Sequence, residues 1–183
     1  MEAVFILTEL GGDRSRDLLV EIATDDSFAE DEIRQAAVWG LGKTGLKRYV
    51  DLVPFLKDAE RDVVLHAIAA FGTDTPSTVI DQLIAELLSA DKRRAPAASE
   101  ALRLIGSDAA LKQLIAAAEG KNTSVDWILA TLGRFSADKV RAALKDNPLL
   151  DRLGPLLLLS NTDNWLAEDT ADIDLKFLFK QNL

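Results

Sequence analysis

The chain has no cysteine, one histidine, one methionine and few aromatic residues, and each shortage removes a class of function. Without cysteine there are no disulfides and no thiolate metal sites, which is compatible with a reducing cytoplasm. One histidine, His66, excludes a metal site built from several histidines, and we expect no cofactor. Alanine and leucine dominate the 183 residues instead, and this composition favours helix.

Segments for export or membrane insertion are also lacking. Residues 1–7 have neither the basic stretch nor the long apolar stretch of a signal peptide. The apolar run 156–159 is too short to cross a bilayer. We therefore expect a cytoplasmic protein that does not bind membranes.

Basic side chains are in deficit, since the formal net charge is −9. Such a surface repels nucleic-acid phosphates and favours a basic partner. Residues 21–32 and 163–174 contain several carboxylates and neither lysine nor arginine. These stretches are either solvated loops and helix starts, where carboxylates suit the helix dipole, or an acidic docking patch.

The sequence does contain a repeated ending, an apolar residue followed by glycine. The glycines recur at intervals of 31, 30, 34 and 27 residues. Self-similarity at this period indicates a solenoid, which is usually a binding surface. The five endings are Leu10-Gly11, Leu41-Gly42, Phe71-Gly72, Ile105-Gly106 and Leu132-Gly133.

Each repeat is expected to be a pair of helices. In residues 33–42 the apolar and small residues follow a helical spacing, and Gly42 is expected to end the helix in a left-handed conformation. In the following helix, Pro54 requires a late start or a bend. Thr75 is expected to cap a helix over 78–90. Further helices are expected over 97–106, 111–118, 124–133 and 137–144.

The ends of the array depart from this pattern. Residues 2–11 are interpreted as the second half of a repeat whose first half is absent. The pattern degrades after position 147. We expect residues 1–147 to form the repeat array and residues 148–183 to form an atypical helical cap of the same domain, since terminal repeats cap the stack.

The segment 31–45 resembles the HEAT-like repeat of the PBS-lyase type, through Ile33-Arg34, the paired Ala36-Ala37 and the terminal Leu41-Gly42. The resemblance implies an all-α, right-handed α-solenoid of about four to five helix pairs. It covers residues 1–145. The other repeats depart from it, since Arg34 is replaced by Val64 and Ala98.

The family includes phycobilin lyases, deoxyhypusine hydroxylases, DNA alkylation glycosylases and scaffolds. A hydroxylase would need several histidines for two irons, and the chain has one. A glycosylase would need a basic groove with aromatic residues and an acid. The chain has aromatic residues at Trp39, Trp127 and Trp165 and an acid at Asp126. The net charge of −9, however, opposes phosphate binding. No feature marks a bilin site, and we expect no enzyme.

In this family the Leu-Gly helices line the concave side. Their outward columns, meaning the equivalent outward-facing positions of successive repeats, are therefore the expected binding surface. These columns are largely apolar, which has two explanations. Either neighbouring helices or residues 155–183 bury them, or they form a groove for a partner with Trp39 as its anchor. The predicted protein-binding residues are Arg34, Val38, Trp39, Val64, Leu65, Ile68, Leu102, Arg103 and Asp126.

These observations predict a non-enzymatic protein-interaction module, a scaffold or adaptor that captures a partner on its concave face. The expected partner is another protein that is basic or presents an apolar helix, not nucleic acid. The alternative is an inhibitor or immunity protein that neutralises a basic enzyme such as a nuclease toxin. The remaining alternative, a HEAT-like DNA glycosylase, would require binding to DNA.

Overall fold

The computed structural model describes residues 1–25, 31–43, 45–89, 91, 94–119, 126–145, 147 and 149. Within these ranges the regular secondary structure is helical and contains no strand, which confirms the predicted all-α class. The elements are α1 (Glu2–Leu10), α2 (Gly12–Thr24), α3 (Asp31–Leu41), α4 (Tyr49–Leu52), the 3₁₀ helix η1 (Val53–Lys57), α5 (Arg61–Ala69), α6 (Ser77–Leu87), α7 (Arg94–Ile105), α8 (Asp108–Ala118), α9 (Asp126–Leu132) and α10 (Ala137–Leu144).

The chain divides into two compact units, Met1–Gln113 and Leu114–Leu183. The predicted cap over 148–183 and the acidic stretch 163–174 lie outside the described residues, apart from Leu149. The division of the array at 147 stays a prediction. Among the helices that are described, none has the length and apolarity needed to cross a bilayer.

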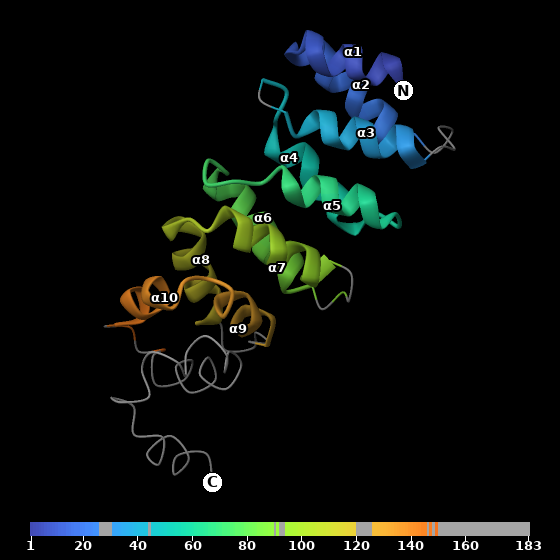
Figure 1. The fold of residues 1–183 in the computed structure, drawn as a ribbon. Coiled ribbons are helices and arrows are strands. Elements are labelled where there is room, and N and C mark those ends of the chain that lie inside the picture. Colours follow the sequence, from blue (N-terminus) through green and yellow to red (C-terminus); the bar gives the residue numbers. More distant parts are fainter. Residues whose placement is uncertain are drawn as a thin grey trace. The chain divides into compact units, whose positions relative to one another are not determined.

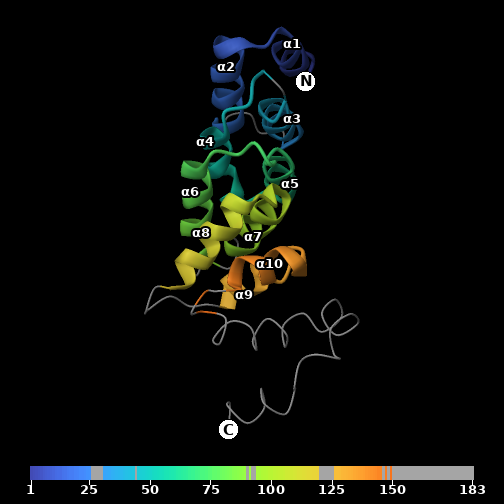
Figure 2. The same cartoon turned by 90° about the vertical axis from the view of Figure 1, so that its left-hand side faces the viewer.

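In the first unit, the helices that carry the Leu-Gly endings pack in chain order. Helix α1 contacts α3, α3 contacts α5, and α5 contacts α7 (Figures 1 and 2). Helix α2 packs on α3, α6 packs on α7, and η1 contacts α5, α6 and α7. In the neighbouring pairs α2 with α3, η1 with α5 and α6 with α7, the helix that carries the repeated ending comes second. This pairing is compatible with residues 2–11 as the second half of a repeat, and that interpretation stays a prediction.

Small apolar residues at helical spacing let these helices approach closely. In α7 the buried positions include Ala95, Ala98, Ala101, Leu102 and Ile105, all 0 % exposed. These residues recur every three to four positions, so they share one face of the helix. Alanine methyl groups keep the axes near each other, and the larger side chains fill the remaining space.

Pro54 interrupts the second helix of its repeat. Helix α4 is four residues long and passes directly into η1, where the proline occupies the first turn. Proline is tolerated there because the first backbone N–H groups of a helix have no acceptor within it. The predicted disturbance is confirmed. The predicted cap at Thr75 is wrong, since its hydroxyl instead donates to the Gly72 carbonyl at 2.7 Å.

Gly42 does not adopt the predicted left-handed conformation. Positive φ occurs at Gly11, Gly12, Gly45 and Gly106 among the described glycines. What Gly42 provides is space, because a Cβ there would lie 2.9 Å from the Ala70 Cβ at the end of α5. The glycine therefore permits close contact between α3 and α5.

Replacing Gly42 by alanine is expected to lower the free energy of unfolding by about 1–3 kcal/mol, as overpacking does in other cores. The added methyl must displace the backbone of α3 or α5, since Ala70 has no rotamer that moves its Cβ away. Urea unfolding followed by circular dichroism measures the change. The double variant Gly42→Ala/Ala70→Gly should recover part of it. Equal stability of Gly42→Ala and the parent would contradict the steric explanation.

The second unit contains the described helices α9 and α10. Their buried apolar residues include Ile128, Leu132, Val140 and Leu144. The Thr131 hydroxyl donates to the Trp127 carbonyl one turn earlier at 2.6 Å, so this buried polar side chain is satisfied within its own helix. The prediction of a helix over 137–144 is confirmed at both ends.

Candidate protein-binding surface

Trp39 lies on the last turns of α3, half-buried, and contacts two other side chains of the first unit. The Phe5 ring meets it edge-to-face, with centroids 5.9 Å apart and planes at 77°. The Lys43 ammonium lies 3.9 Å from the centroid of the indole ring. Both arrangements are favourable for the ring quadrupole, so Trp39 is held in place from two sides.

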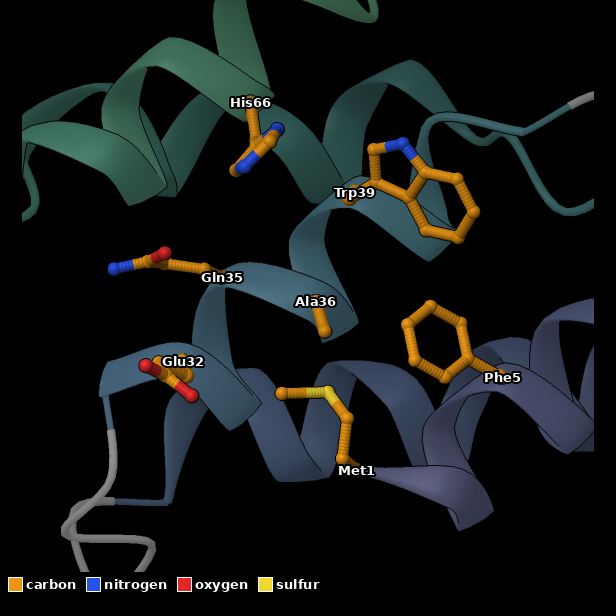
Figure 3. A pocket seen from close by; sticks show the side chains of 7 residues that line it. All are labelled: Met1, Phe5, Glu32, Gln35, Ala36, Trp39 and His66. Carbon is orange, nitrogen blue, oxygen red and sulfur yellow. The ribbon is translucent and has the colours of Figure 1, made fainter.

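Two neighbouring hollows share Trp39 and His66. The first, of about 410 Å³, lies among α1, α3 and α5, and Figure 3 shows Phe5 and Trp39 beside each other on its wall. The second, of about 200 Å³, lies between the end of α3 and α5. The first is lined by Met1, Phe5, Glu32, Gln35, Ala36, Trp39 and His66. The second is lined by Trp39, Gly42, Lys43, His66, Ala69 and Ala70.

The chemistry of these walls is apolar with a few polar groups. Phe5, Met1 and Trp39 offer apolar surface, while Glu32, Gln35 and His66 offer hydrogen-bonding groups. Neither wall contains a hydroxyl or thiol side chain that could act as a nucleophile. Among the described residues, no three potential metal ligands lie together. The walls are suited to packing and hydrogen bonding.

Three of the predicted binding residues belong to the core. Val38 and Leu102 are 0 % exposed and Ile68 is 7 % exposed, so they cannot contact a partner. The reason is that each of their helices is packed from more than one side: α3 contacts α1, α2 and α5, and α7 contacts α5, α6 and η1. The buried part of each helix surface is therefore wider than the apolar stripe that the residue spacing predicts. This corrects the prediction and agrees with its alternative, burial by adjacent helices.

Arg34 is a structural residue. Its guanidinium donates to the Ala23 carbonyl at 3.2 Å and forms an ion pair with Asp58. The two side chains of the pair are 16 % and 12 % exposed. Arg34 thereby joins the end of α2 to the turn after η1 through Nε and one terminal nitrogen. Its contact with a partner stays a prediction.

The remaining predicted residues are more accessible. Leu65 is 46 % exposed on α5, and Val64 beside it is half-buried. Arg103 pairs with Glu100 one turn earlier on α7, and this hydrogen bond and charge raise the pKa of Arg103. Asp126, the exposed first residue of α9, belongs to the second unit. Of the nine predicted residues, Trp39 alone lines the two hollows.

Sequence reasoning missed Met1 and Phe5. The outward positions were compared from residue 33 onward, so α1 was not placed beside Trp39. The Leu-Gly alignment contained the necessary signal, because matching Gly11 to Gly42 places Phe5 at the position of Ala36. Both residues line the first hollow.

Helix α1 also presents an apolar face to solvent. Val4 is its buried residue. The exposed fractions are 44 % for Met1, 46 % for Phe5, 59 % for Ile6 and 72 % for Leu10. Met1 and Phe5 line the first hollow as well, so this part of the apolar surface of α1 is continuous with it.

Comparisons with protein-family models, with curated proteins and with solved structures found no match. Within the described residues the chain is helical, and in the first unit α1, α3, α5 and α7 pack in chain order.

Proposed function

We propose that the chain is a non-enzymatic protein-interaction module, a HEAT-like right-handed α-solenoid that captures a partner protein around Trp39. Support for the solenoid comes from the serial packing of α1, α3, α5 and α7 in the first unit and from the repeated Leu-Gly endings. Its place of action would be the cytoplasm, in agreement with the absence of cysteine.

The environment of Trp39 carries this proposal. A half-buried tryptophan between two hollows has accessible apolar surface and a fixed orientation. Tryptophan is enriched among the interface residues that contribute most to binding. Polar groups at the edge, Glu32, Gln35 and His66, supply the hydrogen bonds that fix a partner's orientation.

Replacing Trp39 by alanine is expected to abolish partner capture while the melting temperature stays nearly unchanged. Loss of a central tryptophan weakens typical interfaces by about 2 kcal/mol or more, which is roughly 30-fold in Kd. The measurement is a pull-down with tagged parent and variant chains, together with a thermal melt of each. Leu18→Ala is the matched control, since Leu18 is 39 % exposed on α2 and lines neither hollow.

A large fall in melting temperature in Trp39→Ala would show instead that the indole acts in the core. Undiminished capture by a stably folded variant would remove Trp39 from the interface. Both outcomes contradict the proposed role of this residue.

The acidic surface supports a second candidate, an inhibitor of a basic enzyme. The net charge is −9, and α1 carries Glu2 and Glu9 and no basic side chain. Binding to such an enzyme would weaken strongly as salt rises, because exposed charges are screened. Washing the captured partner at low and then at high salt tests this candidate, because a partner that stays bound at high salt would contradict it.

A further inference from the structure

We propose, as an inference that rests on the proposed function, that the segment captured beside Trp39 is a basic amphipathic helix. Its apolar side would lie on the exposed face of α1 and reach into the first hollow. Its lysine or arginine side chains would lie against the carboxylates of α1 and α3.

The spacing of the exposed apolar residues fits a helical partner. Met1 and Phe5 are four residues apart on α1, and so are Ile6 and Leu10. Residues at this spacing lie one above the other and form two ridges along the helix. Helices recognise each other by packing such ridges into grooves, and an amphipathic helix supplies apolar residues at the matching period.

The charges around this face select a basic partner. Glu2 and Glu9 are the charged side chains of α1, and Glu32 lines the first hollow. Glu9 lies in the last turn of α1, where the partial negative charge of the helix end adds to its own. The amino group of Met1 offsets part of this charge. Lys43 is engaged with the Trp39 ring and belongs to the second hollow.

The same charges disfavour a second copy of the chain as the occupant. Pairing two α1 helices would bring together Glu2 and Glu9 of both copies, with no basic side chain on either helix. Like charges in contact destabilise an interface. A basic helix instead gains ion pairs with Glu2 and Glu9, which lie between the two apolar ridges of α1, and buries the same apolar residues.

The test uses three synthetic peptides that share one helical pattern of leucines and differ in their polar positions, which are all lysine, all glutamate or all glutamine. The protein is the full chain with Trp127→Phe and Trp165→Phe, so that Trp39 is the remaining tryptophan. Titration is followed by Trp39 emission. We expect the lysine peptide to bind at least tenfold more tightly than the other two, and to weaken as salt is raised.

Variants of exposed residues locate the binding. Leu10→Ser and the double variant Glu2→Gln/Glu9→Gln are each expected to weaken the lysine peptide by about tenfold. Leu18→Ser is the matched control, an exposed leucine on the neighbouring helix, and should leave binding within about twofold. Sedimentation of the peptide-free chain at increasing concentration reports self-association.

The inference is wrong if the glutamate or glutamine peptide binds as tightly as the lysine peptide, or if no peptide changes Trp39 emission up to about 1 mM. It is also wrong if the chain dimerises and Leu10→Ser abolishes the dimer. In each case, loss of a captured partner in Trp39→Ala would still support the proposed function. Failure of that function shows separately, as capture that does not depend on Trp39.

Discussion

Leu102→Ala should lower the free energy of unfolding by about 2–5 kcal/mol. The leucine side chain is 0 % exposed and lies in the alanine-rich core of α7. Its removal costs the transfer free energy of the missing atoms and leaves a cavity that the packed helices cannot close. Urea unfolding, compared at constant m value, measures the difference.

Leu104, two residues further along α7, is the control for this substitution. It is 36 % exposed, so Leu104→Ala should change stability by no more than about 0.5–1 kcal/mol. A similar small effect for Leu102→Ala would mean that Leu102 lies on the surface. It would also restore Leu102 to the candidate binding residues.

Arg34→Met is expected to lower the free energy of unfolding by about 2–4 kcal/mol, because it leaves the Asp58 carboxylate largely buried without its cation. The Ala23 carbonyl loses its donor at the same time. Methionine keeps most of the side-chain volume, so the loss reports the ion pair and the hydrogen bond instead of a cavity.

The exposed pair Arg103–Glu100 provides the comparison. Those side chains are 41 % and 33 % exposed, and surface pairs of this kind contribute about 0–1 kcal/mol, so Arg103→Met should have a small effect. The double variant Arg34→Met/Asp58→Asn should lose less than the sum of the two single variants, since the uncompensated charge is gone. Additive losses would contradict a direct interaction.

The sequence predicted the helical class and several helices because their signals are local. The helix over 137–144 follows from its own apolar spacing, and the Ser107 hydroxyl accepts from the Ala110 N–H at 3.2 Å at the start of α8. Proline at position 54 likewise acts through its own ring. Such features depend on neighbours within a few residues, so a single sequence contains them.

What the sequence could not supply depends on contacts between distant residues. Asp58 is 24 positions from Arg34. Residue patterns within one helix therefore did not predict that these two side chains form an ion pair. Val38 was predicted to contact a partner because the residue pattern of a single helix does not show how many other helices pack against it. Glycines at equivalent positions also differ: Gly106 has positive φ, whereas Gly42 makes room for Ala70.

Gly42 has one more consequence, because it also lines the second hollow beside Trp39. The wall at this point is backbone and the methyl group of Ala70. Any larger residue would separate α3 from α5 and fill the space next to the indole in the same step. A substitution at Gly42 would therefore change the packing of α3 on α5 and the shape of the second hollow together.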